Sequence, residues 1–159
     1  MTGRLFQNVH VVNALPNEST ATDLFNGGVA TDVVNLGKYE KATWILQKGA
    51  GNTGTAVLKV ESCDNTTPST ATAVAFNYWE CTSGDTWGDM QTATSAGFTT
   101  TAGANTMVAV EINSAELSGT DQYARLTATE VANDPVTGYI SCILSQGKVV
   151  QEVSPTAIV

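Results

Sequence analysis

The side chains best suited to nucleophilic or metal chemistry are a single histidine, His10, and three cysteines, Cys63, Cys81 and Cys142. A serine or cysteine nucleophile that works with a histidine base needs that histidine in a preorganised pocket, oriented by a carboxylate. His10 instead lies in an N-terminal stretch of scattered apolar residues. The chain has no C-x-x-C or H-E-x-x-H spacing, so zinc ligation is not indicated. We therefore predict no catalytic residue, no metal site and no bound cofactor.

The cysteines are odd in number, and each lies within or at the end of an apolar or threonine-rich run. In such a run cysteine behaves as a small apolar residue. The opening residues show no apolar segment of the secretory type, so we expect the protein to be made and kept inside a cell, where thiols stay reduced. The sequence thus predicts three free thiols and no disulfide.

The acidic residues offer two further kinds of chemistry. Glu61, Glu80 and Glu111 lie in strand patterns, and a pair of them facing one cleft could hydrolyse glycosides. The acidic turns at 64–65 and 85–89 could contribute oxygen ligands to calcium, but neither matches a calcium-binding loop. Solvent-facing strand positions and ordinary turns explain these residues better, because Asp and Asn favour turns. We therefore predict that the protein is not an enzyme.

Composition and charge narrow the class of protein. The chain has 159 residues, of which 42% are hydrophobic and only 14% charged, a size that suits one domain with a real core. Threonine and valine suit pleated sheets, and asparagine and glycine suit the turns between strands. The net charge of −8 opposes contact with nucleic acid and with anionic membranes, so neither is an expected partner.

The elements that must position these residues are strands separated by turn signals. No 11-residue window has a convincing helical period, although residues 114–117 could form a single turn. The absence of intervening helices excludes a parallel α/β sheet and predicts an all-β antiparallel β-sandwich, jelly-roll-like, with an extended N-terminal arm. The strand patterns cover residues 30–36, 39–48, 55–63, 70–81, 106–112, 122–130 and 136–144, with one or two weaker strands within 86–101.

The two ends of the chain differ from its middle. We divide the chain into an N-terminal arm at 1–28, a β-sandwich domain at 29–150 and a C-terminal tail at 151–159. The arm has apolar residues without a strand-and-turn rhythm. It is either a segment that docks on a neighbouring protein or an edge strand of its own sandwich. We predict docking, through an interface made of Leu5, Phe6, Val9 and Val11.

The phase of the apolar residues within each strand predicts the core. Alternation places one apolar set between the two sheets, and the largest apolar groups belong there. Trp44 and Trp79 both lie in the middle of a strand pattern and are expected in the core, although an exposed pair would instead suggest a sugar-binding platform. The residues predicted to be buried between the sheets are Trp44, Leu58, Val60, Val108, Val110 and Leu126.

The segments from Leu36 to Leu144, about two-thirds of the chain, follow a familiar order. Phe76 and Trp79 stand in its middle, and the segments that carry the order are Leu36–Ala42, Gly54–Asp64, Val110–Ile112 and Asp121–Leu126. This arrangement resembles the small jelly-roll-like β-sandwich proteins that decorate or cement the capsid of tailed bacteriophages.

The resemblance implies a virion structural protein, assembled in the host cytoplasm, that binds and stabilises the surface of the phage head. Its implied partners are the major capsid protein and further copies of itself, with a trimer favoured. The resemblance implies no catalytic residue. Two alternatives stay open, namely a tail or fibre component of the virion and a carbohydrate-binding β-sandwich module.

Overall fold

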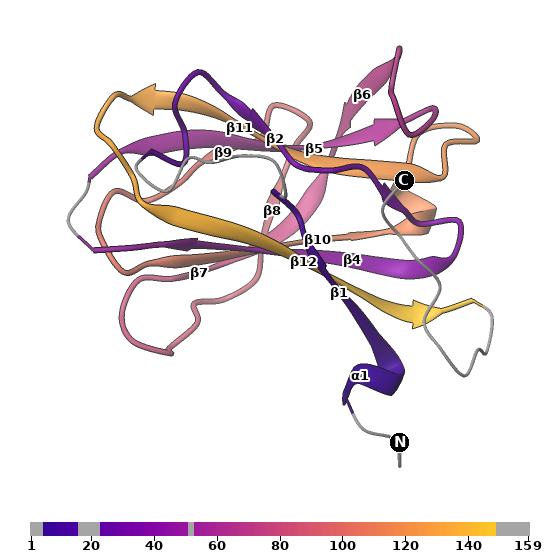
Figure 1. Cartoon of the computed structure of the whole chain (residues 1–159), viewed down its shortest axis with the longest axis horizontal. Coiled ribbons are helices and arrows are strands. Elements are labelled where there is room, and N and C mark those ends of the chain that lie inside the picture. The colour runs from indigo at the N-terminus through magenta and orange to yellow at the C-terminus, as the bar shows by residue number, and fades with distance from the viewer. Residues whose placement is uncertain (1–4, 16–22, 51–52, 149–159) are drawn as a thin grey trace.

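Two antiparallel sheets pack face to face as a β-sandwich in the computed structural model, which describes residues 5–15, 23–50 and 53–148 (Figure 1). Sheet A contains, in spatial order, β1 (Val9–Asn13), β12 (Gly138–Gly147), β4 (Tyr39–Lys48), β10 (Met107–Asn113), β7 (Phe76–Cys81) and β8 (Gln91–Ala93). Sheet B contains β2 (Val29–Ala30), β11 (Tyr123–Ala132), β5 (Thr55–Cys63) and β6 (Ala71–Val74), while β3 (Val34–Asn35) also pairs with β11 and β9 (Phe98–Thr99) with β5.

The pairing of the long strands is nested. β4 pairs with β12, β5 with β11 and β7 with β10. In chain order, the first of these strands, β4, therefore lies beside the last, β12. The second, β5, lies beside β11, and the third, β7, lies beside β10. The connections from β4 to β5 and from β11 to β12 both cross between the sheets. This arrangement makes most sheet contacts long-range in sequence.

The core forms between the inward phases of the two sheets. In β5, Ala56, Leu58 and Val60 are fully buried and alternate with half-buried outward residues, as the period of two in a strand requires. Trp44 is the largest fully buried side chain. All six residues that the sequence predicts for the core are at most 2% exposed, which confirms that prediction: Trp44, Leu58, Val60, Val108, Val110 and Leu126.

The predicted strand bounds agree closely where turns flank a clear alternation. The strands at 39–48 and 55–63 match β4 and β5 residue for residue, and the single turn near 114 is a 3-10 helix at Ser114–Glu116. The run at 30–36 is instead two short strands, β2 and β3. Both pair with β11, and between them the buried Thr31 still donates its backbone N–H to the Leu126 carbonyl of β11 at 2.9 Å.

The segment predicted as one strand over 70–81 is two strands that belong to different sheets, which corrects that prediction. β6 pairs with β5 in sheet B, whereas β7 pairs with β10 in sheet A. Phe76 is buried, and it begins the strand on the opposite layer after Ala75. The composition is strand-like throughout, so a local pattern does not reveal the crossing between the layers.

The N-terminal segment contributes to the sandwich itself. After a four-residue helix α1 (Leu5–Asn8), β1 lies along β12, with Val12 opposite Cys142 in the register. Five described residues of the segment predicted as an arm, 1–28, are buried in the core: Val12, Ala14, Leu15, Leu24 and Phe25. The predicted tail at 151–159 lies outside the described residues.

Candidate functional site

The histidine and the cysteines contact different groups in the described part of the chain. The His10 ring packs near that of Tyr39, with 6.1 Å between the ring centroids. The three cysteines are buried free thiols. Burial raises the pKa of Cys63 to about 11, and it raises the pKa of Cys142 still further. These two sulfurs are therefore protonated at neutral pH, whereas a nucleophile or metal ligand must be a thiolate.

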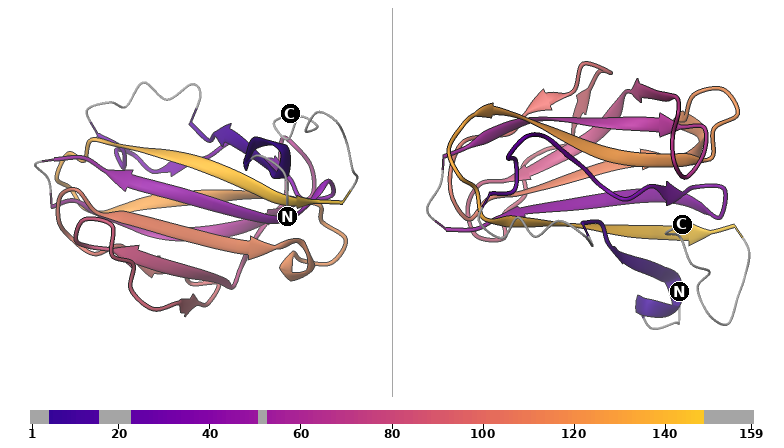
Figure 2. Two further views of the ribbon diagram at one scale, coloured as in Figure 1. Left: turned by 90° about the horizontal axis from the view of Figure 1, so that it is seen from below. Right: turned by 45° about the horizontal axis from the view of Figure 1, so that its top comes forward.

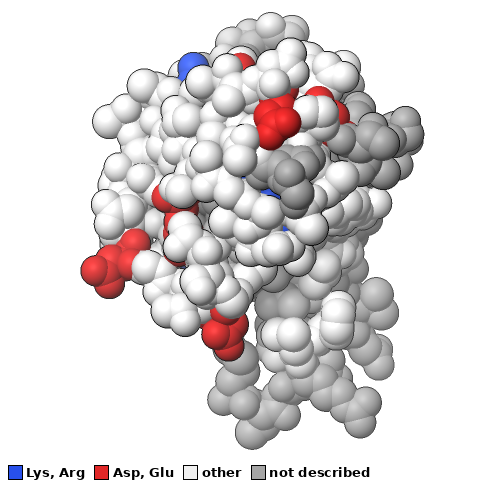
Figure 3. Space-filling view, turned by 90° about the vertical axis from the view of Figure 1, so that its left-hand side faces the viewer, with Lys and Arg blue, Asp and Glu red and all other residues white. Residues whose placement is uncertain are grey.

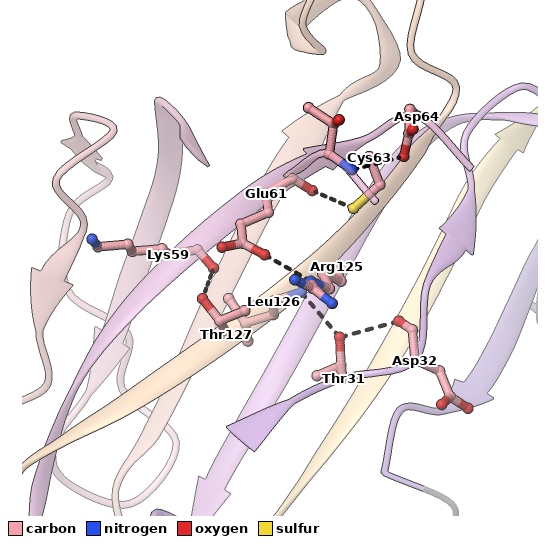
Figure 4. Close-up of polar contacts among 10 residues, drawn as sticks. Thr31, Asp32, Lys59, Glu61, Cys63, Asp64, Arg125, Leu126 and Thr127 are labelled. Atoms are coloured by element: carbon pink, nitrogen blue, oxygen red, sulfur yellow. Dashed lines mark hydrogen bonds and ion pairs between the residues drawn. The ribbon is translucent and has the colours of Figure 1, made fainter. Parts of the chain in front are cut away.

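The three glutamates proposed as a hydrolytic pair lie on different surfaces. Glu61 accepts a hydrogen bond from Arg125 Nε at 2.7 Å on the outer face of sheet B (Figure 4). Glu111 accepts hydrogen bonds from Lys41 and Thr43 on the outer face of sheet A. Glu80 accepts hydrogen bonds from the backbone and the hydroxyl of Thr101. Each carboxylate therefore has its own structural partner, and no two of them face a shared cleft.

The acidic turn at 64–65 is held by its own hydrogen bonds. Asp64 accepts a hydrogen bond from the Ser69 hydroxyl at 3.0 Å, and Asn65 accepts one from the backbone of Thr67 at 2.8 Å. These contacts use the side-chain oxygens to build the turn, as Asx turns do. Across residues 5–15, 23–50 and 53–148, no group of three or more His, Cys, Asp or Glu side chains could hold a metal ion.

One charged side chain, Lys48, is buried at the end of the sandwich. It is 1% exposed, and its ammonium donates hydrogen bonds to the Thr101 carbonyl at 2.7 Å and to the Gly54 carbonyl at 3.4 Å. Burial lowers the pKa of Lys48, and the nearby Glu80 carboxylate opposes that shift. Because the ammonium caps backbone carbonyls from two different loops, its role in this structure is to join loops at that end of the sandwich.

The N-terminal segment places apolar side chains at one edge of sheet A. Leu5 is 67% exposed, Phe6 is 72% exposed and Val11 is 45% exposed, while Val9 is half-buried. Figure 2 shows α1 beyond the body of the sandwich, next to the end of β12. β1 pairs only with β12 among the described strands, so its other edge is open there. Of the four residues predicted as an interface, three are therefore exposed and Val9 is half-buried.

Of the two tryptophans predicted in the core, only Trp44 is there. Its indole is fully buried, whereas Trp79 is half-buried and lies opposite Ala109 in the register, on the outward phase of sheet A. The prediction for Trp79 is therefore wrong. The correct phase follows from its neighbours in β7, because Phe76 and Tyr78 pack on the core and leave Trp79 on the other face.

The outer face of sheet A did not stand out in the sequence analysis. On the outward phase of β4, Ile45 stands between the polar Thr43 and Gln47, so the strand alternates as one with a solvated outer face does.

Comparison of the chain with protein-family models, with curated proteins and with solved structures gives no match. None of the helices in the described part of the chain is long and apolar enough to span a membrane.

Proposed function

We propose that this protein is a structural component of a tailed-phage particle, a decoration or cement protein that binds and stabilises the head surface. Its partner is the major capsid protein, and its place is the virion, assembled in the host cytoplasm. The four apolar residues at the N-terminus, Leu5, Phe6, Val9 and Val11, make the contact. The work is done by surface contact and not by catalysis.

The exposure of Leu5 and Phe6 is the observation that carries the proposal. Two large apolar side chains at 67% and 72% exposure, next to an open strand edge, form the kind of anchor that another protein buries. An open edge also allows a segment of the partner to add as a further strand. Many copies bound to a lattice multiply a modest affinity per copy.

The winding of the chain supports the jelly-roll-like part of the proposal. The nested pairs β4–β12, β5–β11 and β7–β10 are those of a ribbon folded once around a core. The sequence resemblance adds the phage-particle context and favours a homo-oligomer, specifically a trimer. Within the proposed arm, residues 1–28, the contact surface is α1 together with the outward side of β1.

Point substitutions test the contact better than deletion does. Removing residues 1–13 would also remove Val12 from the core, so loss of binding could reflect unfolding. Phe6→Ser alters only an exposed side chain. Burial of a phenylalanine contributes about 1.5–3 kcal/mol, so Phe6→Ser should weaken particle binding by roughly 10- to 150-fold. Val131→Ser is the matched control, because Val131 is 58% exposed on sheet B.

The assay is co-sedimentation of labelled protein with particles of the encoding phage that lack it, over a range of protein concentrations. The expected result is saturable binding that Phe6→Ser weakens and Val131→Ser leaves unchanged. Particles that bind no wild-type protein would refute the decoration function. Binding confined to isolated tails would instead support the alternative, a tail or fibre component.

A carbohydrate-binding module is the second candidate, and the position of Trp79 favours it. The indole is half-buried on the outward phase of sheet A, in the same strand as the polar Asn77, and an exposed aromatic face can stack on a sugar ring. A glycan array separates the two functions. Binding of a glycan that Trp79→Ala abolishes and Phe6→Ser leaves intact would support the module, whereas an array without signal would refute it.

A further inference from the structure

We propose that Asn26 is a site of spontaneous deamidation, in which water converts the side-chain amide to a carboxylate through a cyclic imide formed with Gly27. The modification needs no enzyme and is independent of the particle contact proposed for the N-terminus. It adds one negative charge to each copy, and in part of the product it lengthens the main chain by one carbon atom. Asn26 is also the only asparagine in the chain that a glycine follows.

The turn at 23–28 is anchored on the body of the sandwich. Leu24 and Phe25 are each 1% exposed. The Leu24 backbone N–H donates a hydrogen bond to the Val136 carbonyl. The Asp23 carboxylate accepts hydrogen bonds from the backbone N–H of Phe25 at 3.3 Å and from that of Val136 at 3.2 Å. These contacts hold the first half of the turn against the core and the β11–β12 connection.

The tip of the turn leaves the reacting atoms accessible. Asn26 and Gly27 are both exposed. The Gly28 N–H donates to the Phe25 carbonyl at 3.1 Å, and Gly27 has a φ of +71°, as the third residue of a type II turn does. No described residue bonds the Gly27 N–H or the Asn26 side-chain amide. Apart from the chain neighbours, no atom lies within 4 Å of the position that a Cβ on Gly27 would take. The Gly27 nitrogen can therefore meet the Asn26 amide carbon without losing a contact.

The reaction balances with water as its only co-reactant. The Gly27 backbone nitrogen gives its proton to the solvent and attacks Cγ of Asn26. The N–Cγ bond forms, the Cγ–Nδ2 bond breaks, and ammonia leaves with a proton from the solvent. Water then adds to one carbonyl carbon of the five-membered imide and breaks its C–N bond; opening at Cγ gives aspartate, and opening at the main-chain carbonyl gives isoaspartate. The attack is favoured because both groups belong to one short segment and glycine has no Cβ to crowd the nitrogen.

Other asparagine side chains in the described part of the chain are held by hydrogen bonds. Asn113 is followed by the small Ser114, but its Nδ2 donates to a Glu116 carboxylate oxygen at 3.1 Å, and its backbone N–H donates to the same oxygen at 2.7 Å. The Oδ1 atoms of Asn35 and Asn65 each accept a backbone hydrogen bond at 2.8 Å. These side chains must break a contact before they can turn toward the following nitrogen. Asn113 therefore serves as an internal comparison for Asn26.

The products are expected to weaken this corner of the fold. The β11–β12 connection, which the turn contacts, lies at the end of the sandwich that faces the viewer in Figure 3, where acidic side chains are prominent. A new carboxylate there adds like charge to a chain whose net charge is already −8. Isoaspartate also inserts a main-chain atom just before β2, which begins at Val29. Isoaspartate should therefore disturb the pairing of β2 with β11 more than aspartate does.

Mass spectrometry of the folded full-length chain, aged at mildly alkaline pH and physiological temperature, tests the proposal. Fragment spectra locate each deamidated residue. The rate at Asn26 should exceed that at Asn113 by at least about tenfold. Ageing in water enriched in heavy oxygen should place that isotope in the product. Asn26→Gln, which could react only through a larger ring, should stay unmodified at this position. Asn113→Gln is the matched control and should leave the rate at Asn26 unchanged.

Unfolding the chain in guanidinium separates the effect of the turn from that of the dipeptide. Because no contact must break at Asn26, unfolding should change its rate by less than about threefold, whereas it should raise the rate at Asn113 by at least about tenfold. Aged wild type should also have a lower urea midpoint than fresh protein, and aged Asn26→Gln should not. An Asn26 that stays intact in the folded chain but reacts in the unfolded one, equal rates at Asn26 and Asn113 in the folded chain, or a product without heavy oxygen would each overturn the proposal.

Discussion

Leu58→Ala is the sharpest test of how the two sheets hold together. Leu58 is fully buried in β5, with Ala128 of β11 opposite it on one side and Phe98 of β9 on the other. Its backbone is thus held by strands on both sides, and the side chain points into the space between the sheets. A cavity at this position cannot close by a shift of β5 alone.

The expected cost follows from the burial. Truncation to alanine removes three carbon groups, each worth about 0.8 kcal/mol of transfer free energy, or about 2.4 kcal/mol in total. The cavity that remains adds to this, and measured leucine-to-alanine costs in cores run from about 2.7 to 5 kcal/mol. Because the flanking strands restrain collapse, we predict a loss of about 3–4 kcal/mol in the free energy of unfolding.

Urea denaturation followed by tryptophan fluorescence measures this loss as a lower midpoint at an unchanged slope. Val57→Ala is the control, because Val57 is the next residue in the same strand but points outward and is half-buried. Its expected cost is about 1 kcal/mol or less. A Leu58→Ala cost below about 1 kcal/mol, or equal costs at the two positions, would refute the assignment of the inward phase.

Four further predictions concern single groups. Mass spectrometry without reductant should find three alkylatable cysteines, and a mass two hydrogens lower would contradict the free thiols. Because burial lowers the pKa of Lys48 in the folded protein, the unfolded chain binds that proton more tightly. The wild type should therefore gain stability relative to Lys48→Met as the pH rises toward 10.5, and parallel profiles of stability against pH for the two proteins would refute this. Hydrogen bonds from the backbone and hydroxyl of Thr53 lower the pKa of Asp134, so stability should fall as the pH drops below 3.8, and less so in Thr53→Val. Gly97→Ala should cost about 1–3 kcal/mol, because φ is +80° and a Cβ would overlap the Leu58 carbonyl; Gly84→Ala, with φ of +61° and open space, should cost less in the same urea titration.

The sequence by itself determines the elements that are local in origin. Alternation between apolar and polar residues places β4 and β5 correctly, because a strand has a period of two and the glycine-rich stretch between them cannot continue the ladder. The same alternation identifies the inward phases of β5, β10 and β11 and therefore the core residues from Leu58 to Leu126. The low charge and the scattered turn residues are likewise enough for the all-β class.

Only the tertiary structure decides which strand lies beside which, and therefore which residues reach a surface. β6 and β7 form one unbroken strand pattern, yet they lie in opposite layers, so Trp79 faces outward. β1 lacks a clear rhythm, but the free edge of β12 gives it a partner and buries Val12, while Leu5 and Phe6 stay exposed beyond it. The physical reason is that strand pairing joins residues as distant in sequence as Tyr39 and Gly147, and the burial of a side chain depends on that pairing as much as on its own chemistry.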